Sequence, residues 1–317
     1  MKIIDIINNT QKPRFSFELL PPPKGKDINL IYQAIDPLIG YNPAFISVTY
    51  HREEVAFKQH KNGLLEKKTI HKRPGTVAIS AAIKYKYNLV VLPHIICGGF
   101  SKEETENALI DLHFLGIRDV LALRGDPIKF EEKFVPEPHG HSHALELVQQ
   151  ISNLNKGVYL DDELLNTTAT SFSVGVAGYP EKHSEAPNLS FDLDILKRKV
   201  EAGAEYIVTQ MFFETQKFIN FVNLCRSSGI NIPIIPGIKP ISTFKHLHML
   251  PQTFNIDIPE ELVNQILKCT TNEEVKEVGI QWAIKQSKEL LEFGCPIIHY
   301  YTMGKADNIV KIIQNVF

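Results

Sequence analysis

Polar side chains stand at the ends of several short apolar segments, and their types suit acid–base chemistry. Glu18 lies between large apolar residues and a run of prolines, which would exclude water and raise the pKa of its carboxyl group towards that of a general acid. A solvated or ion-paired acid at the rim of a barrel explains this motif equally well. Asp126 precedes Pro127, and taken alone it is better explained by turn chemistry than by catalysis. The residues that close the apolar segments are Glu18, Thr49, Tyr50, His94, Arg124, Asp126, Tyr179, Glu181, His183, Gln210 and Tyr301.

Nucleotide binding would need basic side chains. Neither a G-x-G-x-x-G sequence nor a P-loop follows any expected strand, so a Rossmann turn cannot hold a nucleotide here. Arg198 and Lys199 could pair with a diphosphate, although a Lys-Arg-Lys run is more often a solvated helix face. The histidines at His139, His141 and His143 fit no zinc-binding spacing, so we expect no metal.

The segments that must position these residues predict an α/β fold. Each short, β-rich apolar run is followed by a polar or Gly/Pro break and then by a longer stretch with helical periodicity. The expected strands are residues 15–19, 45–50, 89–96, 120–123, 172–177, 206–213, 232–238 and 297–301. About eight parallel strands close a TIM-type (β/α)8 barrel, so we expect a single domain over residues 1–317 with its site at the carboxyl ends of the strands.

Four helices are indicated most clearly. Residues 101–116 begin with a serine followed by acidic residues and end at a glycine, and residues 190–202 carry an apolar stripe between charged side chains. Residues 273–293 predict a long helix before the last strand, and residues 307–316 predict a short closing helix.

The composition argues against several classes of protein. Lysine and arginine total 34 against 36 acidic residues, a net charge of -2 that provides no field for nucleic acid or an anionic membrane. No apolar run approaches the roughly 18 residues of a membrane span, and the start of the chain lacks the pattern of a signal peptide. The 4 cysteines form no CxxC pair, which suits reduced, buried thiols. We therefore expect a cytoplasmic protein with small-molecule partners.

Seven segments together resemble the methylenetetrahydrofolate reductase family. They lie in family-like order and spacing between Phe15 and about Lys305. The segments are Phe15-Ser-Phe-Glu18 before the prolines, Ser47-Val-Thr-Tyr50, Leu121-Ala-Leu-Arg-Gly-Asp126, Ala177-Gly-Tyr-Pro-Glu-Lys-His183 with Glu185 and Ala186, Thr209-Gln-Met-Phe-Phe213, Ile235-Pro-Gly-Ile238 and His299-Tyr-Tyr-Thr302. The resemblance implies a barrel that holds FAD across its strand ends. It also implies that NADH or NADPH supplies the hydride that reduces methylenetetrahydrofolate to methyltetrahydrofolate, a step that feeds methionine synthesis.

The resemblance also assigns roles to individual residues. Contacts with FAD would fall on Thr49, Tyr50, His94, Arg124, Gly125, Asp126, Ala144, Tyr179, His183, Ala186, Asp192, Arg198 and Lys199. Contacts with the substrate would fall on Glu18, Gln210, His246, Leu250, Tyr301 and Lys305. Glu18 and Asp126 would be the catalytic residues.

In this family the nicotinamide first reduces FAD, leaves, and is replaced by the folate at the same face. Glu18 would protonate the bridging nitrogen of the folate and open its ring to an iminium cation, which then accepts hydride from the reduced flavin. Asp126 would stabilise that cation, and Gln210 would orient the pterin by hydrogen bonds. Relatives form homo-oligomers, and the same is expected here.

Four departures from the family pattern bear on ligand affinity. Ile195 replaces a polar FAD contact, His143 replaces a tyrosine, and His246 replaces a glutamine near the substrate. Met303-Gly-Lys305 replaces Leu-Asn-Arg, which puts in doubt how tightly the glutamyl tail of the folate is held. The chain also stops soon after the last expected helix, whereas eukaryotic relatives add a domain that binds S-adenosylmethionine, so feedback of that kind is not expected.

Three alternatives stay open. The chain could be a non-catalytic or partner subunit that keeps the fold, a flavin-free barrel lyase or aldolase, or an enzyme whose electron donor is not a nicotinamide. The presence of Glu18, Asp126 and Gln210 argues against the first. The lack of a glycine-rich phosphate loop after the last two expected strands argues against the second.

Overall fold

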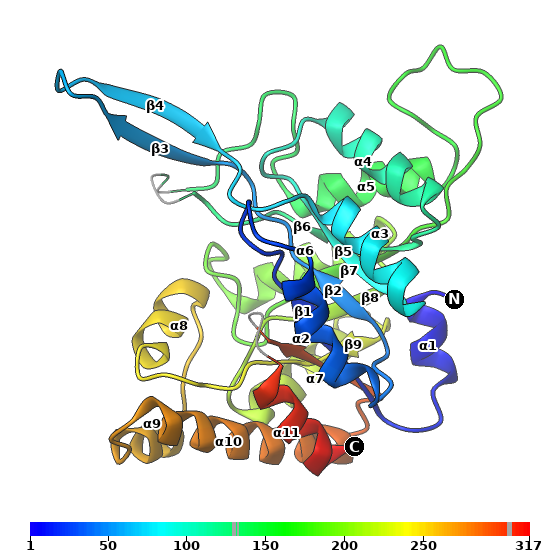
Figure 1. Ribbon diagram of the computed structural model, residues 1–317. Coiled ribbons are helices and arrows are strands. Elements are labelled where there is room, and N and C mark those ends of the chain that lie inside the picture. The colour runs from blue at the N-terminus through cyan, green and yellow to red at the C-terminus, as the bar shows by residue number, and fades with distance from the viewer. Residues whose placement is uncertain (129–130, 132, 303–305) are drawn as a thin grey trace.

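The central feature of the computed structural model is a parallel sheet that curves into a barrel (Figure 1). The structure describes residues 1–128, 131, 133–302 and 306–317. The strands of the sheet are β1 (Arg14–Leu19), β2 (Ile46–Val48), β5 (Val91–Ile96), β6 (Asp119–Leu123), β7 (Ser173–Gly178), β8 (Tyr206–Thr209), β9 (Ile234–Ile235), β10 (Gly237–Ile238) and β11 (Ile297–Tyr301). They lie in the order β10-β11-β1-β2-β5-β6-β7-β8-β9.

β9 and β10 are two halves of one strand that is interrupted at Pro236. β9 pairs with β8 and β10 pairs with β11, both in parallel, so the broken strand joins the two ends of the sheet. Proline has no N–H to donate, but the Pro236 carbonyl oxygen still accepts a hydrogen bond from the His299 N–H at 2.9 Å. Counted as one strand, these halves complete eight, which confirms the TIM-type (β/α)8 barrel expected from the sequence.

Helices follow the strands and form the outer layer (Figure 1). They are α2 (Asn29–Ile39), α3 (Thr76–Tyr87), α4 (Lys102–Phe114), α5 (Ala144–Leu154), α6 (Leu189–Glu201), α7 (Thr215–Ser227), α8 (His246–Phe254), α9 (Glu260–Leu267), α10 (Asn272–Glu292) and α11 (Asp307–Val316). The four helices expected most clearly are confirmed as α4, α6, α10 and α11. α4 begins as its sequence indicates, because the Ser101 hydroxyl accepts from the Glu104 N–H at 3.2 Å while the Glu104 carboxylate accepts from the Ser101 N–H at 2.8 Å.

The alternation of side chains along each strand separates two apolar regions. Phe15 and Phe17 of β1 point outward and belong to the largest buried cluster, which lies between the sheet and the helices. A second cluster fills the inside of the barrel at its amino end, where the short helix α1 (Ile3–Asn9) contributes Ile3 and Ile6. The Ile3 N–H donates to the buried carboxylate of Asp119 at 2.8 Å. The amino end of the barrel is therefore closed, and polar side chains are placed at the carboxyl end.

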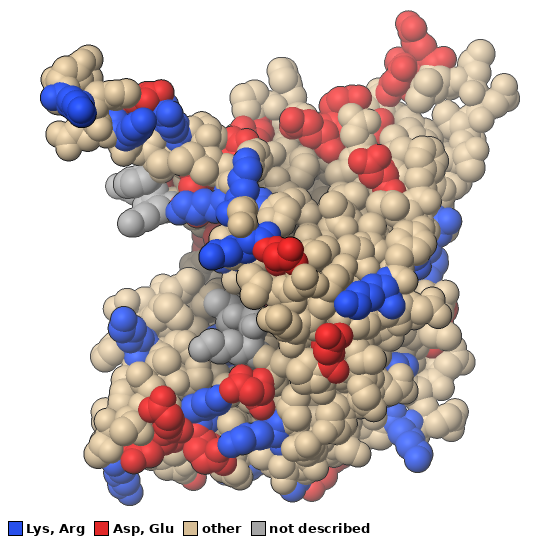
Figure 2. All heavy atoms as spheres, in the orientation of Figure 1, with Lys and Arg blue, Asp and Glu red and all other residues tan. Residues whose placement is uncertain are grey.

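An antiparallel hairpin between β2 and α3 was not expected from the sequence. β3 (Glu54–Gln59) and β4 (Leu65–Ile70) pair with each other, in a register that runs from Glu54↔Ile70 to Gln59↔Leu65. The hairpin projects from the body of the barrel (Figure 1), and lysine and arginine side chains are prominent along it (Figure 2). It occupies the loop that leaves β2, so it begins at the same end of the barrel as the polar side chains.

The two short helices α8 and α9 also lie outside the expected elements. They pack with α10 around a third apolar cluster, which includes Leu250, Leu262, Ile266 and Val275. Within the part of the chain that the structure describes, no helix combines the length and the apolar character that crossing a bilayer requires.

Candidate functional site

Polar side chains from neighbouring strands meet inside the barrel at its carboxyl end. The alternation that sends Phe17 of β1 outward turns Glu18 inward. Glu18 pairs in register with Tyr301, the last residue of β11. His94, which is buried on β5, faces Glu18 from across β2. Three residues predicted to contact ligands are thus brought together.

The carboxyl group of Glu18 is largely shielded from solvent. Its side chain is 15% exposed, and its Oε2 atom lies 3.8 Å from Nε2 of His94. Burial raises the pKa of Glu18 to about 7, against the opposing positive charge of Lys239. Burial lowers the pKa of His94 to about 3, with a further contribution from His51, so the His94 ring is neutral near pH 7. A carboxyl group that is partly protonated near neutral pH is suited to general acid catalysis.

A hydrogen-bonded network forms the floor of the site. Nδ1 of the His299 ring lies 2.8 Å from the Ser16 hydroxyl, and Nε2 lies 3.3 Å from the Ser47 hydroxyl. The Tyr301 hydroxyl donates to the carbonyl oxygen of Thr209 at 2.6 Å. The rings of Tyr301 and His299 meet edge-on with their centroids 5.2 Å apart. These contacts fix the Tyr301 ring, because its hydroxyl group is hydrogen-bonded and its ring packs against His299.

A second group of polar side chains follows β6. Arg124 forms an ion pair with Glu185 and lies over the Phe134 ring, 5.1 Å from its centroid. The Nε atom of Arg124 is buried and has no hydrogen-bond partner among the described residues. Gly125 has a φ of +87°, and a Cβ there would approach Cδ1 of Ile96 to 3.1 Å. Glycine therefore allows the backbone after Arg124 to turn where a side chain would be strained.

The loop after β7 is fixed to the start of α6. The Tyr179 and His183 rings meet edge-on at 4.7 Å between centroids, and the His183 N–H donates to the Asp192 carboxylate at 2.8 Å. Asp126 is exposed at the rim of the barrel, and its charge acts on Tyr179 and on His51. Asp126 therefore lies near both groups of polar side chains.

The two basic residues near the end of α6 differ in exposure. Arg198 is exposed, whereas Lys199 is half-buried, and burial lowers its pKa against the opposing charge of Asp192. The charge of Lys199 also acts on Cys97 and is repelled by Arg124, so the ammonium group lies on the Arg124 side of the barrel. Among the described residues it makes no hydrogen bond or ion pair. An unpaired ammonium and a guanidinium edge with a free N–H form a donor set suited to a diphosphate.

Five other predicted contact residues lie on loops or helix starts that follow the strands. Thr49 and Tyr50 come directly after β2, and Ala144 is the first residue of α5. Ala186 is buried in the loop before α6, where its carbonyl oxygen accepts from the Lys182 ammonium at 2.7 Å. Gln210 follows β8 and is half-buried.

α8 carries two of the residues predicted to contact the substrate. His246 is half-buried, and its Nδ1 atom accepts from the Ser242 N–H at 3.2 Å. Burial and the charge of Lys239 lower the pKa of His246 to about 4. Leu250 is fully buried in the cluster shared with α9 and α10, so its contacts are with protein. Lys305, also predicted to contact the substrate, lies outside the described residues.

Comparison with known proteins shows the family of the chain. The profile of a protein family described as methylenetetrahydrofolate reductase matches residues 2–316. The chain belongs to this family. Methylenetetrahydrofolate reductase (NADH) 1 of Arabidopsis thaliana is 33% identical, and the match covers 100% of this chain and 51% of that protein. The 5,10-methylenetetrahydrofolate reductase of Buchnera aphidicola subsp. Baizongia pistaciae is 30% identical, and the match covers 98% of this chain and 94% of that protein. The chain thus spans about half the length of the plant relative and most of the bacterial one.

A solved structure shares the fold. An uncharacterized protein from Clostridium thermocellum, described as binding two copies of 5-methyl-5,6,7,8-tetrahydrofolic acid, superposes with a TM-score of 0.59. The match covers 99% of this chain and 97% of that one at 14% sequence identity. At that identity the likeness concerns the barrel alone.

Two of the departures from the methylenetetrahydrofolate reductase pattern lie on the helices beside the second polar group. His143 is the N-cap residue of α5 and makes no side-chain capping hydrogen bond. Ile195 is partly buried on α6. Their effect on cofactor affinity stays a prediction.

Sequence analysis did not predict the part that two residues, Glu185 and Lys239, play in the site. Glu185 was noted within a family motif, but its ion pair with Arg124 was not foreseen. Lys239 follows β10, is 5% exposed and acts on Glu18. Its signal was available, because Lys239 directly follows the expected strand 232–238, for which no polar end residue was assigned.

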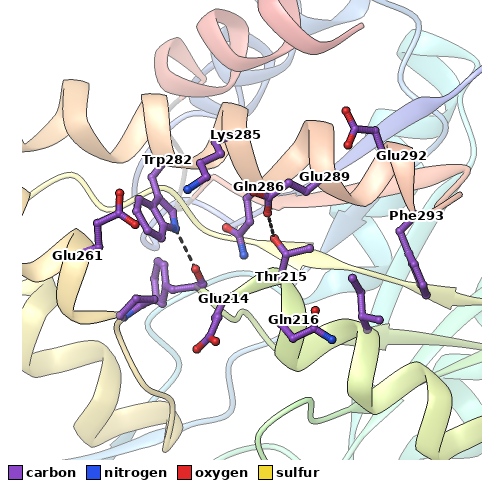
Figure 3. A pocket seen from close by; sticks show the side chains of 13 residues that line it. Glu214, Thr215, Gln216, Glu261, Trp282, Lys285, Gln286, Glu289, Glu292 and Phe293 are labelled. Atoms are coloured by element: carbon purple, nitrogen blue, oxygen red, sulfur yellow. Dashed lines mark hydrogen bonds between the residues drawn. The ribbon is translucent and has the colours of Figure 1, made fainter.

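A cavity of about 620 Å³ lies away from these residues, between α7, α9 and α10 (Figure 3). Its inner polar groups are already paired, since the Trp282 indole N–H donates to the Phe213 carbonyl oxygen at 2.9 Å and Thr215 bonds to Glu289. None of the predicted site residues lines it. Among the described residues, no group of three or more histidines, cysteines or acids is arranged to hold a metal ion.

Proposed function

We propose that this chain reduces methylenetetrahydrofolate to methyltetrahydrofolate, with FAD as bound cofactor and NADH or NADPH as hydride donor. The observation that carries the proposal is the carboxyl group of Glu18, which is largely buried at the carboxyl end of the barrel and has a pKa raised to about 7. Such a group can give a proton to a weakly basic nitrogen near neutral pH. Membership of the methylenetetrahydrofolate reductase family supports the choice of substrate.

The second polar group has the chemistry to hold FAD. Arg124 and Lys199 would bind the diphosphate, the first through its unpaired N–H and the second as a point charge. Glu185 would release Arg124 or share it with the ligand, because their ion pair is partly exposed to solvent. When bound, FAD would supply the transfer of hydride from the nicotinamide to the folate-bound carbon.

Glu18, Asp126 and Gln210 would act on the folate. The O–H bond of Glu18 breaks as its proton moves to the bridging nitrogen, and the bond between that nitrogen and the methylene carbon opens to give an iminium cation. Asp126 would stabilise the cation by its negative charge, and Gln210 would bind the pterin by hydrogen bonds. The neutral His94 ring contributes no opposing positive charge.

The proposal includes two properties of the whole protein. We expect residues 1–317 to act as one catalytic domain in the cytoplasm. We also expect a homo-oligomer, which light scattering coupled to size-exclusion chromatography would measure.

The proposal is tested by colour and by product. Purified protein should be yellow, should bleach when NADH or NADPH is added without oxygen, and should recover its colour on addition of methylenetetrahydrofolate while methyltetrahydrofolate forms. A colourless preparation that cannot be reconstituted with FAD would instead indicate a subunit without cofactor or a flavin-free barrel enzyme. A yellow protein that nicotinamides cannot bleach, but that methylenetetrahydrofolate reoxidises after chemical reduction, would indicate a different electron donor.

A further inference from the structure

A buried lysine, Lys239, lies close enough to Glu18 for its charge to act on the carboxyl group. Lys239 directly follows β10, whose Ile238 pairs in register with Tyr300 of β11. Glu18 of β1 pairs with Tyr301, the next residue of the same strand. Lys239 and Glu18 therefore lie on opposite sides of the end of β11, at nearly the same level of the barrel. Lys239 is only 5% exposed, which is unusual for a side chain that normally extends into water.

Nothing among the described residues pairs with the ammonium group of Lys239. It forms neither a hydrogen bond nor an ion pair there. Its charge nevertheless acts on Glu18 and on His246. Burial lowers the pKa of Lys239 to about 8, against the attraction of Glu18, so the group still carries its proton at neutral pH. A buried positive charge without a contact partner is energetically costly. Its presence is explained if it stabilises a negative charge that forms nearby.

The other titratable groups next to Glu18, and those next to Lys239 and His94, are uncharged near pH 7. His94 on β5 and His299 on β11 have pKa values lowered to about 3, chiefly by burial. His246 on α8 has a pKa lowered to about 4, and burial raises the pKa of Tyr301 well above its usual value. Within the described part of the chain, Lys239 is therefore the one charge that acts on Glu18.

We propose that Lys239 is a positioning residue that stabilises the carboxylate formed on Glu18 when the proton passes to the folate. This inference rests on the proposed function. In the step, the O–H bond of Glu18 breaks and an N–H bond forms at the bridging nitrogen, while Lys239 keeps its own proton. The transfer creates a negative charge in a site with little water. A fixed positive charge nearby offsets that cost and makes Glu18 a stronger acid.

The test separates the two half-reactions by stopped flow between pH 6 and 9. Lys239→Met removes the charge with little change in length, Lys239→Gln is a second neutral variant, and Lys239→Arg keeps the charge. Enzyme that has been reduced beforehand is mixed with methylenetetrahydrofolate, and oxidised enzyme is mixed with the nicotinamide. The flavin absorption spectrum and the thermal midpoint report whether each variant is folded.

For the neutral variants we expect the folate half-reaction to slow about tenfold on its low-pH plateau, because the acid is weaker. Its alkaline limb should move up by about one pH unit, because Glu18 then holds its proton more tightly. The nicotinamide half-reaction should stay within about threefold, and Lys239→Arg should restore both features of the profile.

Three outcomes decide the matter. An unshifted pH profile in a folded neutral variant would overturn the inference, and so would equal slowing of both half-reactions. Failure of Lys239→Arg to restore the profile would also count against it, because the charge would then not be the cause. If Lys239→Met does not fold, the same readings are taken from Lys239→Gln and Lys239→Arg.

If the wild-type reduced enzyme does not react with the folate at all, the proposed function itself fails. If it does react and Glu18→Gln stops it while Lys239 substitutions leave the profile unchanged, only the inference fails.

Discussion

The Nε2 atom of His94 lies 3.8 Å from the Oε2 atom of Glu18, and no hydrogen bond joins them. The histidine nitrogen is buried and has no partner among the described residues, and the Glu18 carboxyl group makes no side-chain hydrogen bond there. Because a buried polar atom without a partner is costly, we expect a bound ligand to supply a partner to these groups. The carboxyl proton of Glu18 would then be free to pass to that ligand.

Replacement of the acid should separate the two half-reactions. In Glu18→Gln, reduction of the flavin by the nicotinamide should stay within about threefold, whereas reduction of methylenetetrahydrofolate should slow by at least ~100-fold, since only that step needs the proton. Stopped-flow absorbance measures both rates. Glu163→Gln, which changes an exposed loop acid, is the matched control. Loss of both half-reactions in Glu18→Gln would contradict the role as acid.

Removal of the half-buried ammonium group of Lys199 on α6 should weaken the proposed binding of FAD. Lys199→Met is expected to raise the Kd for FAD by about 10-fold or more, because a charge-assisted contact with a phosphate is lost. Lys197→Met changes an exposed neighbour on the same helix and should leave the affinity within about twofold. Titration of apoprotein, followed by quenching of flavin fluorescence, compares the two. If Lys199→Met and Lys197→Met bind FAD with equal affinity, Lys199 does not bind the diphosphate.

The pH dependence of stability should reveal the buried acid at the amino end of the barrel. Burial raises the pKa of Asp119 to about 7, above its value in the unfolded chain. The folded state thus binds a proton that the unfolded state has lost between about pH 4 and 7, so this group lowers the free energy of unfolding as pH rises through that window. Asp119→Asn keeps the acceptor for the Ile3 N–H and removes the ionisation.

Urea unfolding at a series of pH values measures this effect. The stability of Asp119→Asn relative to wild type should rise by up to ~1.4 kcal/mol per pH unit between pH 4 and 7 and level off above pH 8. A difference that does not vary with pH would show that Asp119 does not change its protonation over this range.

A methyl group on the broken strand should disturb the floor of the site. A Cβ at Gly237 would come within 2.4 Å of the Thr209 carbonyl oxygen and 2.6 Å of Cε2 of Tyr301. Gly237→Ala should therefore lower the free energy of unfolding by about 1–3 kcal/mol and displace Tyr301, with loss of folate reduction. Gly40→Ala, where nothing lies within 4 Å, should change stability by less than about 0.5 kcal/mol. Thermal and urea unfolding test both, and a neutral Gly237→Ala would mean that the strand can yield.

The barrel could be predicted because strand and helix periods alternate along the chain. Two errors have a physical cause. The expected strand 206–213 ends at Thr209 in the structure, because Met211 and Phe213 are drawn into the apolar cluster under α8 and α9. The expected strand 232–238 is divided at Pro236, which cannot donate to the sheet. Apolar character alone does not show which neighbour a segment will contact.

The hairpin of β3 and β4 was missed although a signal existed. Asn62-Gly63 is a typical hairpin turn, and Gly63 has a φ of +80°. The flanking residues are mostly exposed, and their apolar and polar side chains do not alternate, so no such pattern marks the strands. A hairpin whose residues are mostly exposed leaves little trace in the sequence pattern.

The residue types of the candidate site could be predicted, but not their electrostatic setting. The raised pKa of Glu18 was expected from its apolar surroundings. Lys239 lies more than 200 positions away in the sequence, and only the closure of the barrel brings it to Glu18. The neutral state of His94 depends equally on burial by distant strands. A charge environment of this kind is a property of the assembled barrel.

The geometry of the hairpin has a practical consequence. Its two strands leave the body as facing residues, Glu54 opposite Ile70, and its tip at Asn62 and Gly63 is exposed. The tip therefore offers an attachment point for a fluorophore or an immobilisation handle that leaves the packing of the barrel intact. The base of the hairpin continues from the loop after β2, at the carboxyl end of the barrel. A fluorophore on the hairpin would therefore lie outside the candidate site and still respond to ligands that bind at that end of the barrel.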